Sequence, residues 1–288
     1  MAIGRRNDVL RSLSLASVSL IGSMRVLKLS ISPKSVIVAS SIALANQLAK
    51  TIYLYTGKQL QTAQYTRNLG VVYSASTRRR AVLQNKRHSK SFKRMRRISS
   101  LAKAVSKARG LLQTGALPQG LWGHQNLGVS PTAMKAIRTN AAAATAIGGH
   151  GRCATTALAL TLGHDKDPAV TTALSHLSMY FNMFKSMDPF LRGLTVRNWS
   201  NIYNRVVSDD GSVRWGRVIS IISGTVATLT QFGWNCKLPH KWKDCNDTEW
   251  TLDLSLPPAL YKPVLSSFSN PLFPTSGLRP LTMKWVEA

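Results

Sequence analysis

Few side chains of this chain have the types and spacing that metal-dependent catalysis requires. Asp209 and Asp210 are adjacent, as in the paired aspartates of polymerases, and Gly211 follows them. A second acidic cluster comprises Asp244, Asp247, Glu249 and Asp253. Two-metal catalysis needs carboxylates that converge on both ions. We interpret the aspartate pair as part of a turn and the cluster as solvated charges of one hairpin.

Other candidate sites are incomplete. His150, in a Gly-Gly-His-Gly segment, and Cys153 are two metal-capable residues, whereas a structural zinc site uses four ligands. Lys58 follows a glycine without the rest of a phosphate-binding loop. The three cysteines lack the paired spacing of a zinc site or a disulfide framework, which predicts reduced thiols in an intracellular protein. The sequence therefore predicts no metal site and no cofactor in this chain.

The distribution of charge is the most informative feature of the sequence. Of the 38 Lys and Arg residues, 25 lie in residues 1–164, which contain a single carboxylate, Asp8. Residues 165–288 are nearly balanced, with 13 basic and 10 acidic side chains. A region with many cations and no compensating carboxylates favours a polyanionic partner, above all nucleic acid, because phosphate neutralisation releases counterions.

The basic residues are densest between Thr77 and Arg109, where 13 of 33 residues are Lys or Arg. An apolar set recurs there at spacings of three and four and predicts one side of an amphipathic helix packed on a core: Phe92, Met95, Ile98, Leu101, Ala102, Val105 and Ala108. The opposite side presents Lys90, Lys93, Arg94, Arg96, Arg97 and Lys103. About 20 helical residues span about 30 Å, enough to follow several phosphates of a duplex.

Capping and periodicity predict the elements that precede this helix. Asn7 is the expected cap of a helix over 8–22, and Ser40 or Ser41 the cap of a helix to about Leu54. Strands are predicted over 25–31, 35–39 and 69–73, with a turn at Thr56-Gly57.

The residues beyond the basic helix predict mostly helical structure. Ser130-Pro131 and Asp167-Pro168 each begin a helix, to about Ile147 and Met187 respectively. The Phe- and Met-rich face of the second is expected to be core. A helix or buried segment is predicted over 213–230, then a hairpin around Asn246-Asp247 and a Pro-rich tail from Pro257.

The order of several short motifs resembles the end of the palm and the thumb of non-LTR retrotransposon reverse transcriptases. The motifs are Lys34 in a Ser-Pro-Lys-Ser loop, the Leu69-Gly70 pair, the basic helix, and the Leu-Trp-Gly segment that ends at Gly123. The resemblance covers about residues 7–146, and more faintly 233–250. It implies an α+β fold: a small α/β palm remnant (1–76), a mostly helical thumb-like region (77–150), a helical connection region (151–233), and a hairpin and Pro-rich tail (234–288).

The resemblance also implies roles for individual residues. Lys34 corresponds to a lysine thought to protonate the leaving pyrophosphate, and Leu69 and Gly70 to the primer-grip turn, although Leu27-Lys28-Leu29 stands where a Gly commonly opens the loop. The thumb surface that follows the template-primer duplex corresponds to Arg78, Arg79, Arg80, Lys86, Arg87, Lys90, Lys93, Arg94, Arg96, Arg97 and Lys103.

The chain also departs from this family in its carboxylates. The family's catalytic aspartates precede the lysine loop, where this chain has only Asp8. The resemblance therefore implies a truncated or degenerate polymerase fragment that binds template-primer-like duplexes without polymerising alone. Mg²⁺ is implied as a cofactor only if the missing palm carboxylates are supplied elsewhere. With about six phosphates contacted, the affinity is expected to fall on the order of a thousandfold between 50 and 200 mM salt.

Two other functions stay open at this point. The basic helix is also compatible with a structural RNA-binding protein of a ribosome or organelle, which co-sedimentation with ribosomal particles would reveal, and with a membrane-surface helix. No uninterrupted apolar run reaches the roughly 18 residues of a membrane span. We expect an intracellular protein of the nucleus or cytoplasm. The Arg- and Ser-rich start is also compatible with a mitochondrial transit peptide.

Overall fold

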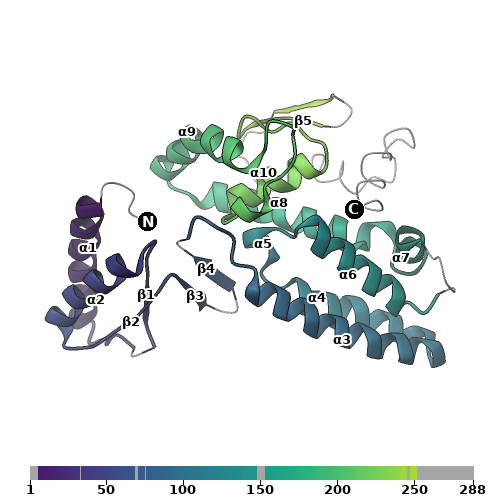
Figure 1. The fold of residues 1–288 in the computed structure, drawn as a ribbon, viewed down its shortest axis with the longest axis horizontal. Coiled ribbons are helices and arrows are strands. Elements are labelled where there is room, and N and C mark those ends of the chain that lie inside the picture. Colours follow the sequence, from purple (N-terminus) through teal and green to yellow (C-terminus); the bar gives the residue numbers. More distant parts are fainter. Residues whose placement is uncertain are drawn as a thin grey trace. The chain divides into compact units, whose positions relative to one another are not determined.

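The computed structural model describes residues 6–32, 34–68, 71–74, 76–147, 153–244 and 247–251. The chain divides into two compact units, residues 1–80 and residues 81–288. Helices predominate, and the few short strands form small two-stranded sheets (Figure 1). This architecture confirms the predicted class, a mostly helical α+β fold. The division into palm-like, thumb-like, connection and tail segments stays a prediction.

The first unit contains two helices and two small sheets. Its elements are α1 (Arg6–Val26), β1 (Val36–Val38), α2 (Ile42–Thr56), β2 (Gln61–Ala63), β3 (Tyr65–Asn68) and β4 (Val71–Ser74). Strands β1 and β2 pair in parallel, and β3 and β4 pair antiparallel. The helices pack through a small core that includes Ile21, Leu48 and Ile52. Strands β2 and β3 are short and polar, and the sequence pattern did not predict them.

The ends of α2 follow from local chemistry. Ser41 is the N-cap, and its hydroxyl accepts a hydrogen bond from the N–H of Leu44 at 3.2 Å. Gly57 ends the helix in the left-handed region, with φ of 68°, which glycine adopts without a steric penalty. Both the predicted cap and the predicted turn are confirmed.

The strand predicted over 25–31 is wrong. Arg25 and Val26 complete α1, which extends beyond the predicted 8–22 at both ends. Lys28 then adopts a φ of 55°, and the N–H of Leu29 donates to the carbonyl of Met24 at 2.8 Å. These bonds satisfy carbonyl groups at the helix end. Alternation of polar and apolar residues leads to a strand only where a partner strand is available for hydrogen bonding. Here the backbone N–H groups of Lys28 and Leu29 bond to carbonyls at the end of α1 instead.

Helix α1 is the one helix in the described ranges whose length and composition suit a membrane span, over Asn7–Val26. The mixed Ser and Leu composition meets that test without an uninterrupted apolar run. Only 6% of this segment is buried. A signal sequence near the N-terminus, or a core helix, passes the same test, so one such helix is weak evidence for a span.

The second unit contains the remaining elements (Figure 1). They are α3 (Val82–Ala104), α4 (Leu117–Leu121), α5 (His124–Leu127), α6 (Pro131–Ala144), α7 (Ala154–Leu162), α8 (Pro168–Ser186), α9 (Pro189–Val206), α10 (Ile221–Gln231), β5 (Lys241–Lys243) and β6 (Glu249–Thr251). A π-helical turn, Leu112–Ala116, precedes α4, and 3₁₀ turns lie at Ser106–Gly110, His164–Lys166 and Trp215–Arg217.

Aspartate-proline pairs begin two of the long helices. Asp167 caps α8 by accepting the N–H of Ala169, as predicted, and Asp188 caps α9 in the same way through Leu191. No helix was predicted from the sequence at the position of α9. Asp167 also forms a bidentate ion pair with Arg138 of α6, at 2.8 to 3.1 Å; Asp167 is buried and Arg138 is partly buried. This pair fastens the start of α8 to α6.

The second unit has two hydrophobic cores. One lies among α3, α4, α6 and α7 and contains Met95 and Ile137. The other lies among α8, α9, α10 and β5 and is aromatic, with Tyr180 and Trp199 at its centre. The predicted core face of α8 is therefore confirmed.

The C-terminal predictions are correct in part. β5 and β6 pair antiparallel across Asn246-Asp247, which confirms the hairpin. The helix or buried segment expected over 213–230 contains α10 from Ile221 onward, whereas Val213 is extended chain and forms a β-bridge with Val207. The helix predicted from Ser130-Pro131 to about Ile147 is α6, which ends at Ala144. The predicted Pro-rich tail lies outside the described residues.

Candidate nucleic-acid interface

Helix α3 separates apolar and basic residues onto opposite faces. Met95, Ile98 and Ala102 are buried against the first core, as predicted. Leu101 and Val105 are more than half exposed, so their assignment to the packed face is wrong. Leu101 lies about 100° from the centre of the buried face, and Val105 follows the end of the helix, where the 3.6-residue period no longer applies.

The exposed face of α3 carries a continuous row of cations. We call Lys86, Lys90, Lys93 and Arg97 the basic stripe; all four side chains are exposed. Their spacings of four, three and four residues place them on one line along the helix. At about 1.5 Å per residue the stripe extends for about 16 Å. Lys103 and Arg96 are also exposed on this helix.

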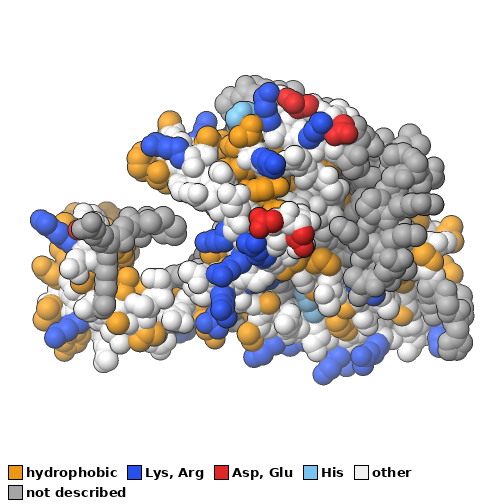
Figure 2. All heavy atoms as spheres, turned by 45° about the horizontal axis from the view of Figure 1, so that its top comes forward, with side chains coloured by type: hydrophobic (Ala, Val, Ile, Leu, Met, Phe, Trp, Pro, Cys, Tyr) orange, Lys and Arg blue, Asp and Glu red, His pale blue; other side chains and the backbone are white. Residues whose placement is uncertain are grey.

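No carboxylate of the described residues neutralises the basic stripe. The ion pairs found in the described ranges are Arg138–Asp167, Lys241–Glu249 and Lys243–Asp247, none of which involves α3. On the face drawn in Figure 2, the acidic side chains of the second unit lie near its top and centre, among Lys and Arg, and Lys and Arg without acidic neighbours recur along its lower edge. The four cations of the basic stripe therefore have no ion-pair partner among the described residues.

Two arginines of α3 also hold the fold together. The Nη1 of Arg87 donates to the carbonyl of Trp122 at 2.7 Å, and the Nη1 of Arg94 donates to the carbonyl of Gly115 at 3.3 Å. Both carbonyls belong to the segment around α4, which crosses α3 closely. At Gly120 an added Cβ would lie 2.8 Å from the Oγ of Ser91, so only glycine fits this crossing.

The site residues that the sequence predicts in the first unit do not form one row like the basic stripe. Arg80 lies over the ring of Tyr65, 5.9 Å from its centroid. Burial lowers the pKa of Arg79 to about 10, which leaves it cationic at neutral pH. Arg78 is exposed, and so is Lys34, in the turn before β1. Leu69 and Gly70, the predicted primer-grip turn, lie outside the described residues.

The adjacent aspartates form a turn, as interpreted from the sequence. The N–H of Ser208 donates to Ser212 at 2.8 Å, and Gly211 has a φ of 78°. A hydrogen bond from the N–H of Ser212 lowers the pKa of Asp210. This carboxylate stabilises its own loop.

The acidic cluster of the hairpin is also explained by local bonds. Asp244 accepts the indole N–H of Trp250 at 3.0 Å, and Asp247 and Glu249 pair with lysines of β5. Across the described ranges, no three His, Cys, Asp or Glu side chains gather as a metal site would require. His150, Cys245 and Asp253 lie outside those ranges.

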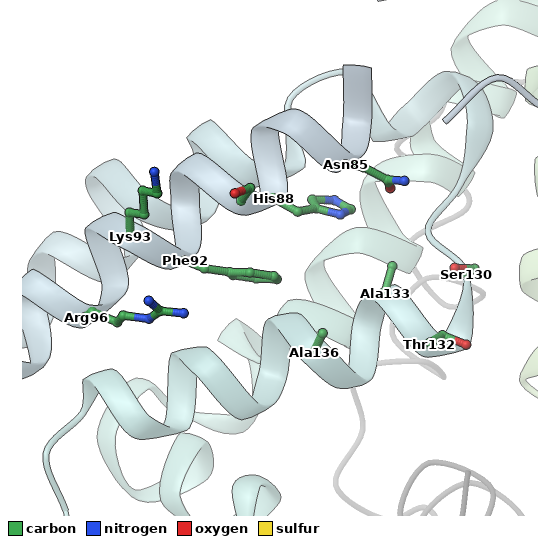
Figure 3. A pocket seen from close by; sticks show the side chains of 10 residues that line it. Asn85, His88, Phe92, Lys93, Arg96, Ser130, Thr132, Ala133 and Ala136 are labelled. Atoms are coloured by element: carbon green, nitrogen blue, oxygen red, sulfur yellow. The ribbon is translucent and has the colours of Figure 1, made fainter. Parts of the chain in front are cut away.

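A groove between α3 and α6 opens beside the basic stripe. We call it the α3–α6 groove; its volume is about 440 Å³. It is lined by Asn85, His88, Ser89, Phe92, Lys93, Arg96, Ser130, Thr132, Ala133 and Ala136. Figure 3 shows the rings of His88 and Phe92 extending from α3 toward the small side chains of α6.

The sequence gives no sign of this groove, because the apolar period predicts only that Phe92 packs on the core, which it does in part. The apolar period correctly places Phe92 near the packed side of α3, and the side chain is half-buried. Whether a flanking aromatic is covered depends on the residues opposite it. Here they are Ala133 and Ala136, about 40 positions later in the chain, and they are too small to fill the space.

No protein-family model matches the chain, and neither a curated protein nor a solved structure is significantly similar to it.

Proposed function

We propose that this chain binds the phosphate backbone of a nucleic-acid duplex along α3, as the thumb-like part of a degenerate non-LTR retrotransposon reverse transcriptase. The basic stripe is the observation that carries the proposal. Four exposed cations stand in one row on a long helix whose other face is fixed in a core. A rigid row of cations with no described carboxylate partner suits a regular line of negative charges.

The dimensions of the stripe are compatible with a duplex. Each strand carries one phosphate per about 3.4 Å of the duplex axis, so a stripe of about 16 Å passes roughly five phosphates of one strand. Lysine and arginine side chains reach phosphates without reading bases. The binding we propose is therefore governed by charge and salt, with little dependence on sequence.

The proposal includes binding without nucleotidyl transfer by this chain alone. Transfer through two metal ions needs several carboxylates that converge on both ions. The sequence offers only Asp8 before Asp165, and the Asp209-Asp210 pair stabilises its own loop. Reverse transcription would need these carboxylates from outside the 288 residues of this chain.

The test uses the full chain and three fluorescein-labelled 20-bp ligands of one sequence: duplex DNA, duplex RNA and an RNA–DNA hybrid. Fluorescence anisotropy measures the affinity between 50 and 200 mM KCl. Four phosphate contacts predict a decrease of about 150-fold over this range. An affinity independent of salt would exclude backbone binding. Primer extension by the purified chain in Mg²⁺ would exclude the non-polymerising role.

A further inference from the structure

The α3–α6 groove has features of a binding site that the basic stripe does not use. Its volume of about 440 Å³ lies within the range of small-molecule sites. It combines an aromatic wall, an aliphatic wall and a polar rim. Of its lining residues, the apolar period of the sequence predicts packing on a core only for Phe92.

The aromatic wall is the half-buried ring of Phe92 on α3, next to which lies the ring of His88, itself only 6% exposed. His88 and Phe92 stack with their centroids 6.2 Å apart and their planes 26° apart. The opposite wall consists of Ala133 and Ala136, which leave space for a flat group between the helices (Figure 3). Planar bases stack on such aromatic faces irrespective of their identity. The shape of the groove therefore suits a nucleobase.

The rim of the groove favours a negatively charged ligand. Lys93 stands at its outer edge, and the guanidinium of Arg96 lies beside the Phe92 ring (Figure 3). None of the described lining residues is acidic. Asn85 supplies an amide, and Ser130, which begins α6 without a side-chain capping bond, supplies a hydroxyl. Cations beside an aromatic wall match the phosphate and the base of one nucleotide.

The groove is also continuous with the proposed backbone site. Lys93 belongs both to the basic stripe and to the lining of the groove. A strand whose phosphates follow the stripe therefore passes the mouth of the groove. A paired base cannot leave its duplex without loss of stacking, whereas an unpaired base can enter at little cost.

We propose that the α3–α6 groove binds an unpaired nucleobase of the strand whose phosphates lie on the basic stripe. This inference rests on the proposed function, because the stripe delivers the strand to the groove. Single-stranded ends and bulges supply such bases. A free mononucleotide has the same chemistry, and the experiment separates the two sources.

The experiment compares a 20-bp DNA duplex with the same duplex carrying one bulged 2-aminopurine. Anisotropy gives the affinities, and 2-aminopurine fluorescence reports stacking. We expect the bulged duplex to bind about tenfold more tightly, with quenched fluorescence, since stacking on one aromatic side chain has this magnitude. Phe92→Ala should abolish the preference and the quenching while the affinity for the perfect duplex stays unchanged. Phe92→Tyr should retain both.

Two further variants distinguish loss of the groove from a folding defect caused by Phe92→Ala. Ala133→Leu with Ala136→Leu fills the groove from the opposite wall and should also abolish the preference. Leu101→Ala, an exposed apolar position of the same helix, is the matched control and should leave it intact. Thermal unfolding of each variant shows that the second unit remains folded.

The outcomes distinguish this inference from the proposed function. Tight, salt-dependent binding of the perfect duplex without a preference for the bulge would overturn the inference alone. Failure to bind any duplex would overturn both. Phe92-dependent binding of 2-aminopurine riboside monophosphate, without a preference for the bulge, would assign the groove to free nucleotides and overturn the claim about a strand.

Discussion

Removal of the basic stripe is the most direct test of the binding mechanism. We would replace Lys86, Lys90, Lys93 and Arg97 with glutamine in the full chain. Glutamine has a helix propensity close to those of lysine and arginine, so α3 should persist. All four side chains are exposed and lie outside the buried face of the helix. The substitution therefore removes charge without removing core.

The magnitude follows from counterion release. Each phosphate contact contributes about 0.9 to the slope of log affinity against log salt, so four contacts contribute about 3.6. The ratio of the wild-type affinity to that of the quadruple variant should therefore be about 150-fold smaller at 200 mM salt than at 50 mM salt. A loss that is constant across this range would instead indicate a structural defect.

A matched control separates local contacts from net charge. Glutamine at Lys185, Arg197, Arg217 and Lys237 removes the same number of exposed charges from other elements of the second unit. The same labelled duplexes and anisotropy titrations apply. We expect this control to keep nearly the whole salt slope of the wild type. An equal decrease of the slope in both variants would refute the assignment of binding to α3 and indicate attraction by the net charge of +27.

The remaining predictions concern stability and thiol chemistry. Asp167→Ala should lower the free energy of unfolding by about 2 to 4 kcal/mol in a urea titration, because it leaves the partly buried Arg138 without its carboxylate partner and removes the α8 cap. Gly120→Ala should lower it by about 1 to 3 kcal/mol, since the new methyl group would meet Ser91. Cys153 is exposed, and hydrogen bonds from Thr156 lower its thiol pKa, so its thiolate fraction and its reaction rate with a disulfide reagent at pH 7 to 8 should exceed those of an ordinary exposed thiol. Burial raises the pKa of Cys236 to about 12, so it should not react until the protein unfolds.

Controls are available on the same chain. Gly110→Ala meets no atom within 4 Å and should cost much less stability than Gly120→Ala. Equal losses at the two glycines would show that the crossing of α3 and α4 is not tight. The thiol measurements use a Cys245→Ser background, so that two cysteines remain. Rapid labelling of Cys236 in the folded protein would contradict its burial.

Short-range chemistry made much of this fold predictable. A serine before an apolar run and an aspartate-proline pair fix helix starts through hydrogen bonds that span two or three residues, as at Ser41 and Asp167. The phase of α3 follows from the 3.6-residue period, so its buried and basic faces could be read directly from the sequence. The strand expected over 25–31 failed because alternation cannot show whether a partner strand exists.

The sequence by itself determined the cation-rich character of the first 164 residues and the row of charges on one side of α3, because net charge and helical phase depend on order alone. Tertiary packing decided the rest. It placed Ala133 and Ala136 opposite Phe92, about 40 residues away, so that a side chain packed against the first core also forms the wall of a groove. The space between two helices depends on the sizes of side chains that meet only after folding, and periodicity within one segment does not contain that information.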